Sequence, residues 1–216
     1  MTEYVPVVWD IETTGLNPLQ QYWWSDADQN AQVTAVAWGV LDCDWKHGEI
    51  EHDTHSICDK SEYELLGSVR AAFEDLENSM MMDGDKEPFL IGWNARNFDH
   101  PYIGARYARL RQNGYPTAYG WKRLDMMRAV KKETGTYYSE DDYANEVDIE
   151  TEPVGEGSDM PDLFKNGQLQ EIRNHVIADI KMAAEIFVKR REIMMKEFYD
   201  HYDIDKTASW ADREEL

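Results

Sequence analysis

The sequence VVWDIETTGL, residues 7–16, is the stretch that most limits which folds the chain can adopt. An apolar run typical of a β-strand ends there in two acids, Asp10 and Glu12. Side chains two residues apart on a strand point to the same face and lie about 7 Å apart, so both carboxylates can meet at one cation. The threonines and the glycine that follow end the strand and let the backbone approach a ligand closely. An edge strand with a solvated acidic face is the alternative, and acids further along the chain favour the metal site.

Length, composition and charge set limits on the class of protein. The 216 residues, 42% of them hydrophobic, are enough for one sizeable core, and no linker rich in Pro, Gly or Ser divides them. We therefore expect a single domain over residues 1–216. The formal charge of −21 repels nucleic acid unless cations bridge the protein and the phosphates. The chain shows no signal-peptide pattern and no apolar run of about 18 residues, so we expect a cytoplasmic protein without a membrane span.

Apolar patterns predict a sheet covered by helices. Residues 32–41 and 49–57 are strand-like runs joined by a polar turn that contains glycine, which predicts a hairpin continuing from the first strand. Residues 88–93, PFLIGW, predict a short buried strand. The order of strands and helices along the chain indicates an α/β fold.

Three helices are predicted from start signals and periodicity. Residues 61–64, SEYE, form a capping box, and apolar residues at helical spacing follow them. Pro101 opens a second helical pattern, so Asp99 lies at a strand-to-helix junction, where it either serves a site or only caps the helix. The third helix is predicted by six apolar residues at spacings of three and four: Leu169, Ile172, Val176, Ile180, Ala183 and Phe187.

Two further segments have distinct compositions. Residues 137–159 are acidic and poor in apolar side chains, which predicts an acidic loop or flap. Residues 189–216 extend the last helix with several large apolar side chains. We expect this C-terminal helical extension to pack on its own domain, with a partner or dimer contact as the alternative.

Three motifs in a fixed order resemble the DEDD, or DnaQ-like, 3′-5′ exonucleases. They are DIETTGL at residues 10–16, NARNFD at 94–99 and HVIAD at 175–179. The match spans residues 5 to about 190 and is most similar to the proofreading domain of family B DNA polymerases and its stand-alone relatives. LDMM at 124–127 and MPDLF at 160–164 support it. The resemblance implies a ribonuclease H-like fold with a mixed central β-sheet flanked by α-helices.

The third motif departs from both large branches of that family. The polymerase-type branch has Tyr four residues before the last Asp, and the other has His five residues before it. Here His175 stands four residues before Asp179. Four residues on a helix keep both side chains on one face, so the imidazole can still point at a metal site. Near neutral pH an imidazole accepts a proton from water more readily than a phenol does.

The resemblance implies a set of metal ligands and a base. Asp10, Glu12, Asp99 and Asp179 would hold two divalent cations, Mg²⁺ or Mn²⁺, which prefer carboxylate oxygen. Asp10, Glu12 and Asp179 would hold the cation that activates water, and Asp10 and Asp99 would contact the second. His175 would orient or deprotonate the attacking water. A histidine on a helix surface is the alternative for that residue.

Residues around the motifs are expected to contact the substrate. The expected substrate-binding residues are Thr13, Thr14, Leu16, Asn97 and Phe98. Asn97, with Asn94, satisfies the local turn in the alternative interpretation. Trp23 and Trp24 either stack on a terminal base or fill a hydrophobic seam.

Two other sets of charged residues have structural interpretations. Asp125 is expected to be structural. The basic residues Arg106, Arg109 and Arg111 either steer the strand or, as we favour, form a solvated helix face.

The implied activity is metal-dependent 3′-5′ exonuclease hydrolysis that releases nucleoside 5′-monophosphates. The expected substrate is the 3′ end of single-stranded DNA. An exoribonuclease of the same fold and a catalytically decayed module that binds nucleic acid or a partner are the alternatives. A separate polymerase or a repair or replication protein is a candidate partner, and the oligomeric state stays open.

Overall fold

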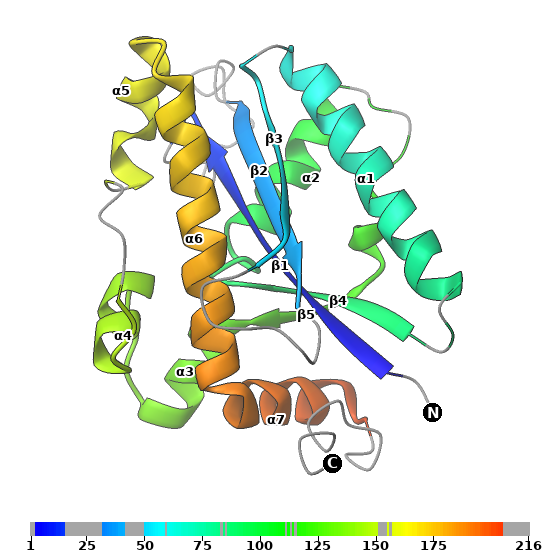
Figure 1. Ribbon diagram of the computed structural model, residues 1–216, viewed down its shortest axis with the longest axis vertical. Helices are drawn as coiled ribbons and strands as arrows, with labels where there is room; N and C mark the ends of the chain where they lie inside the picture. Colours follow the sequence, from blue (N-terminus) through cyan, green and yellow to red (C-terminus); the bar gives the residue numbers. More distant parts are fainter. Residues whose placement is uncertain are drawn as a thin grey trace.

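A computed structural model describes residues 3–15, 32–41, 50–58, 60–82, 84, 86–110, 112, 114, 116–150, 155 and 157–204. Its centre is a five-stranded sheet in the order β3-β2-β1-β4-β5 (Figure 1). The strands are β1 (Glu3–Thr13), β2 (Val33–Val40), β3 (His52–Ser56), β4 (Lys86–Gly92) and β5 (Lys122–Asp125). β1 pairs antiparallel with β2 and parallel with β4, so the sheet is mixed.

Helices cover both faces of the sheet (Figure 1). They are α1 (Glu62–Met82), α2 (Asp99–Arg109), α3 (Met126–Thr134), α4 (Glu140–Glu146), α5 (Met160–Lys165), α6 (Leu169–Lys189) and α7 (Arg191–Tyr202). The short 3₁₀ turns η2 (Thr117–Tyr119) and η3 (Gly157–Asp159) lie between them in the chain. In the described part of the chain, none of the helices combines the length and the apolar character that a membrane crossing requires.

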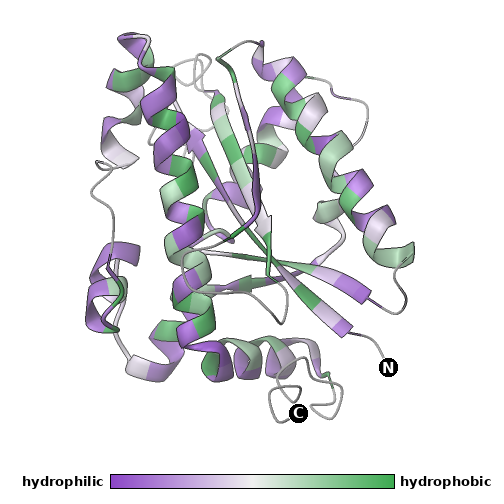
Figure 2. Ribbon diagram, viewed as in Figure 1, coloured by the Kyte–Doolittle hydropathy of each residue, from purple (hydrophilic) through white to green (hydrophobic). Residues whose placement is uncertain are grey.

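The hydrophobic core has two layers, one on each face. α6 packs on β1 and β2 on one face, together with apolar side chains of α3, α4 and α7, while α1 and α2 pack on the other face. β1 serves both layers because its side chains alternate: Val8 belongs to the α6 layer, and Val7 and Trp9 belong to the α1 layer. Figure 2 shows the apolar centre of the sheet against the hydrophilic outer faces of α1 and α6.

The predicted fold class is confirmed. The mixed central sheet flanked by helices is the arrangement expected of a ribonuclease H-like fold. The hairpin of β2 and β3 is antiparallel as predicted. The capping box is formed at α1, where the Ser61 backbone N–H donates to Glu64 Oε2 at 2.8 Å and the Ser61 hydroxyl donates to the same oxygen at 2.7 Å.

Two predictions about local structure are corrected. The prediction of an acidic loop or flap over residues 137–159 is wrong for residues 140–146, which form α4, because Ser139 caps that helix and Tyr143 and Ala144 are buried. The C-terminal extension does not continue α6: α6 ends at Lys189, and α7 turns away beneath it (Figure 1). The turn buries four large side chains of α7 in the core, namely Met194, Met195, Phe198 and Tyr199. This part of the extension therefore packs on its own domain, as expected.

Candidate active site

β1 presents Asp10 and Glu12 towards α6. Both follow Val8 at spacings of two, on the face that carries the α6 layer. Their partners across the antiparallel ladder are alanines, Ala37 and Ala35, which leave space above the acids for another element. The register shifts between Glu12 and Thr13. Irregularities of this kind often re-aim a side chain next to an active site.

The turn after β4 brings Asp99 to the same end of β1. β4 pairs with β1 only as far as Val8, so the acids of β1 extend beyond the carboxyl end of β4. A Cβ on Gly92 would lie 3.0 Å from the Trp9 carbonyl oxygen, so the turn needs a glycine to pass this close to β1. Asn94 then adopts a left-handed conformation with a φ of 54°. Asp99 is the first residue of α2, and the N-cap position before it is occupied by Phe98, so Asp99 is not the cap residue of this helix.

α6 supplies His175 and Asp179 from the opposite side. The two side chains lie one turn apart, and His175 Nδ1 is 3.0 Å from Asp179 Oδ2 and 2.8 Å from Glu12 Oε1. These contacts are ion pairs rather than aligned hydrogen bonds. His175 is only 5% exposed, and Ile172, one turn before it, is buried in the core and anchors this part of α6 to the sheet.

Among the described residues, one group offers atoms at the spacing of metal ligands. Glu12, His175 and Asp179 each have a ligand atom within 4.8 Å of the others. Asp10 and Asp99 lie outside this group, although their charges interact with it: Asp10 is repelled by Asp99 and Asp179, and Asp99 by Glu12. Carboxylates from β1, α2 and α6 therefore meet in one partly buried cluster.

Burial dominates the protonation of these acids. Burial raises the pKa of Asp10 well above its ordinary range, and the charges of Asp99 and Asp179 add to the effect. Burial also raises the pKa of Glu12 to about 7, against an opposing contribution from His175. The pKa of Asp99 is raised to about 8 by burial, although the backbone N–H groups of Asp99 and Ile11 lower it. Near neutral pH the cluster thus holds protons that ordinary carboxyl groups have lost.

Burial acts on the pKa of His175 in the opposite direction, but it does not dominate there. Burial lowers its pKa, but Asp179 and Glu12 outweigh burial and raise the pKa to about 10. The imidazole is therefore protonated at neutral pH while both carboxylates face it. A protonated ring cannot accept a proton from water. The predicted role as a base requires that another cation compensate these two carboxylates.

Glu140 is an acid of this cluster that the sequence did not suggest. It opens α4, and its Oε1 is buried without a hydrogen-bond partner. Burial raises its pKa well above the ordinary value, and the charges of Asp179, Asp141 and Asp99 raise it further. Tyr143, three residues later on the same side of α4, is buried in the core. The sequence signal for α4 was Ser139, a preferred N-cap residue, followed within the first turns by Tyr143 and Ala144.

The donor set suits a hard divalent cation. Asp99 Oδ1 and Glu140 Oε1 are buried carboxylate oxygens without a hydrogen-bond partner. Buried polar atoms normally have partners, and Mg²⁺ and Mn²⁺ take carboxylate oxygens as ligands. A cation would also relieve the repulsion that raises the pKa of Asp10. The residues present therefore fit such an ion.

The expected substrate-binding residues lie around this cluster or hold local structure. The hydroxyl of Thr13 donates to the Gly15 carbonyl at 2.9 Å, and the hydroxyl of Thr14 accepts from the backbone of residue 32 at 2.9 Å. Asn97 is exposed, and its side-chain amide donates to Asn94 Oδ1 at 2.9 Å. This contact stabilises the local turn, which was the alternative interpretation of the two asparagines. Phe98 is half-buried against the α1 layer. Leu16 lies outside the described residues, as do Trp23 and Trp24.

The other charged residues have structural roles where the structure describes them. Asp125 caps α3: its carboxylate accepts from the backbone N–H of Arg128 at 3.1 Å and of Arg96 at 3.2 Å. The prediction of a solvated face is wrong for Arg106, whose Nε donates to buried Glu62 at 2.7 Å. Arg109 is exposed. Arg111 lies outside the described residues.

Comparison with known proteins gives a structural likeness and no sequence match. No protein-family model matches the chain, and no curated protein matches it. The chain is similar to E. coli exonuclease I, solved in complex with a 5cy-dA13 oligonucleotide, with a TM-score of 0.47 and 13% sequence identity. The similarity covers 93% of this chain and 43% of exonuclease I, so the chain spans less than half of that protein.

Proposed function

We propose that this chain is a metal-dependent 3′-5′ exonuclease that acts on single-stranded nucleic acid and releases nucleoside 5′-monophosphates. DNA is the proposed substrate. The observation that carries the proposal is the meeting of acids from three distant segments, β1, α2 and α6, at the carboxyl end of β4. The three motifs that carry the family resemblance contribute these acids in the expected order.

The acids would act by holding cations and positioning the scissile phosphate. Asp10, Glu12, Asp99 and Asp179 are the proposed ligands of two divalent cations, and the buried Oε1 of Glu140 is available to join them. When bound, such cations activate a water molecule and neutralise charge on the transferring phosphate. The same charge compensation offsets the repulsion between a phosphate and a chain of formal charge −21.

His175 would orient the attacking water and accept its proton. Its position between Glu12 and Asp179 places it beside the proposed ligands. Compensation of those carboxylates by bound cations removes the cause of its raised pKa, so the imidazole becomes able to act as a base. The flanking residues Thr13, Thr14, Leu16, Asn97 and Phe98 remain the proposed contacts to the terminal nucleotides.

The test is hydrolysis of a 5′-labelled single-stranded oligonucleotide with Mg²⁺ or Mn²⁺. We expect shortening from the 3′ end and 5′-mononucleotides as products. Asp10→Ala and Asp179→Ala should each lower the rate by about 100-fold or more, because each removes a direct ligand. Asp162→Ala, at a residue whose side chain is 80% exposed on α5, is the matched control and should keep full activity. Full activity of the Asp10 and Asp179 variants would show the assignment to be wrong.

Paired assays separate the alternatives. DNA and RNA oligomers of one sequence distinguish the proposed enzyme from an exoribonuclease, since the choice depends on contacts to the 2′-hydroxyl. A catalytically decayed module would bind an oligonucleotide without metal-dependent hydrolysis at any salt concentration.

A further inference from the structure

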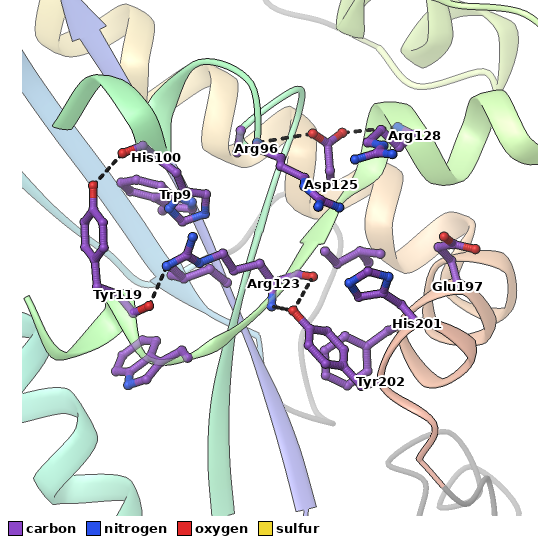
Figure 3. Close-up of a pocket in the computed structure, with 15 residues that line it drawn as sticks. Trp9, Arg96, His100, Tyr119, Arg123, Asp125, Arg128, Glu197, His201 and Tyr202 are labelled. Atoms are coloured by element: carbon purple, nitrogen blue, oxygen red, sulfur yellow. Dashed lines mark hydrogen bonds between the residues drawn. The ribbon is translucent and has the colours of Figure 1, made fainter. Parts of the chain in front are cut away.

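A cavity of about 440 Å³ lies beside the edge strand β5. Side chains from the start of α2, from η2, β5 and α3, and from α7 line it, together with Trp9 of β1 (Figure 3). None of the five acids or His175 of the candidate active site is among its lining residues. Its volume is within the usual range for small-molecule sites, about 300 to 1,000 Å³.

The cavity gathers positive charge in a strongly acidic chain. Arg96, Arg123 and Arg128 line it, against the two acids Asp125 and Glu197. Glu197 already pairs with Lys132. Asp125 accepts the backbone N–H groups of two of the arginines rather than their guanidinium groups (Figure 3). No ion pair within the described residues takes up the guanidinium groups of Arg96 and Arg128, which act on Asp125 only through their charge, so both are available to an anion. The Arg123 guanidinium already donates to the Tyr119 carbonyl.

Two buried donors in the lining lack acceptors. Trp9 is only 3% exposed, and its Nε1 has no hydrogen-bond partner. Arg123 Nε is likewise buried and unpartnered, while another nitrogen of the same guanidinium donates to the Tyr119 carbonyl at 2.5 Å. A buried donor without an acceptor destabilises the folded state. Two of them in one cavity indicate a ligand that carries acceptor atoms.

Aromatic rings form much of the remaining wall. Tyr119, Trp121 and Tyr202 line the cavity from η2, the residues that follow it, and α7. Arg123 lies over the Tyr119 ring at 5.3 Å, and Figure 3 shows it reaching across the cavity. His100 packs against Trp9 with ring centroids 4.7 Å apart. Such walls favour a flat, unsaturated group.

We propose that this cavity is a binding site for a nucleoside 5′-monophosphate, separate from the acidic cluster. The phosphate would bind Arg96 and Arg128, whose side chains are exposed at the cavity. The base would pack among the aromatic walls and accept hydrogen bonds from Trp9 Nε1 and Arg123 Nε. The proposal rests on the cavity alone and holds whether or not the chain is an exonuclease.

Calorimetric titration of the full chain tests the site. The probes are adenosine 5′-monophosphate, adenosine and inorganic phosphate, each in EDTA so that no divalent cation recruits phosphate to the acidic cluster. We expect the monophosphate to bind at least about tenfold more tightly than either fragment, because both the anion and the base contribute. Equal affinity for phosphate would reduce the site to an anion site, and no binding of the monophosphate would also refute the proposal.

Three substitutions locate the ligand. Arg96→Gln and Arg128→Gln should each weaken binding of the monophosphate by about tenfold. Both leave the backbone N–H groups that Asp125 uses, so the cap of α3 is preserved. Arg109→Gln, an exposed arginine of α2 outside the cavity, is the matched control and should leave the affinity within about twofold. Equal weakening of monophosphate binding by all three substitutions would show that binding depends only on the net charge of the chain and not on this cavity, and would refute the proposal.

A further pair of variants separates the cavity from the acidic cluster. Trp9→Phe removes the orphan donor and keeps an aromatic ring, so it should weaken binding of the monophosphate while phosphate binding is unchanged. Asp10→Asn should leave binding intact. Loss of binding in Asp10→Asn, with Trp9→Phe unaffected, would place the ligand at the acidic cluster and overturn the proposal.

Discussion

Replacing Asp99 with asparagine should stabilise the cation-free protein while removing its proposed activity. Asp99 is 2% exposed, and its Oδ1 has no partner. Its pKa rises from the ordinary 3.8 to about 8. At pH 7 folding must therefore supply a proton to this carboxyl group, which costs about 4 kcal/mol at 1.4 kcal/mol per pH unit. The amide replaces a carboxyl group that is also neutral and buried in the folded state, so the two burial costs nearly cancel, and we expect Asp99→Asn to gain up to about 4 kcal/mol at pH 7.

The sign of the pH dependence makes this prediction specific. Because the folded pKa of Asp99 lies above the unfolded one, the native state binds the proton more tightly than the unfolded state does. The wild type then loses stability from this group as the pH rises from about 4 to about 8, and the asparagine variant does not. The difference between the two should be small at pH 4.5 and should grow up to about pH 8.

Urea unfolding in EDTA, followed by the fluorescence of the eight tryptophans, measures the difference. Asp162→Asn applies the same change to an exposed aspartate and should shift stability by less than about 0.5 kcal/mol at every pH. Activity with Mn²⁺ should fall by about 100-fold in Asp99→Asn alone. A difference in stability that is constant with pH, or a variant less stable than the wild type at pH 8, would refute the electrostatic reasoning.

Three further outcomes follow from the same cluster. Mn²⁺ should raise the melting temperature by about 5 °C more at pH 8 than at pH 5. The reason is that Glu12, with a pKa of about 7, and Asp99, with a pKa of about 8, must lose their protons before they bind the cation. Equal shifts of the melting temperature at both pH values would contradict this. His175→Ala should lower kcat by about 10² to 10⁴ with little change in KM, and unchanged kinetics would exclude its role as base. Glu140→Gln should weaken Mn²⁺ binding about tenfold, whereas Glu146→Gln, on the exposed side of α4, should not; a Glu140 variant with wild-type affinity would remove this acid from the ligand set.

The parts of the fold that the sequence predicts are those with strong local signals. The Ser61–Glu64 capping box fixes the start of α1, and the apolar spacing from Leu169 to Phe187 defines α6, because each signal acts within a few residues. β5 carries no such signal. It has four residues, KRLD, two of which are basic and half-buried, so no alternation of apolar and polar residues marks it. Its place is set by pairing with β4.

Long-range contacts explain the remaining differences between the predicted and the observed structure. The separation of α7 from α6 occurs at Arg190, without a proline or glycine, because burial of the apolar side chains of α7 decides the turn. The pairing of Arg106 with Glu62 joins residues 44 apart, which no local pattern reveals. Motif order indicates which acids belong to one site. It does not give their protonation, which depends on how deeply the fold buries them and on which charges face them.

That protonation links cation binding to the proposed chemistry. The fold buries several acids against one another although each is costly to ionise there, and a local conflict of this kind is typical of a functional site. The same conflict determines the state of His175: while Glu12 and Asp179 are uncompensated, they hold its proton and the ring cannot serve as a base. Cation binding lowers the pKa values of the acids and that of His175 together, since one set of charges governs both. The proposed base is therefore active only when the proposed ligands are occupied, which couples the removal of a proton from water to the presence of the ions that stabilise the resulting hydroxide.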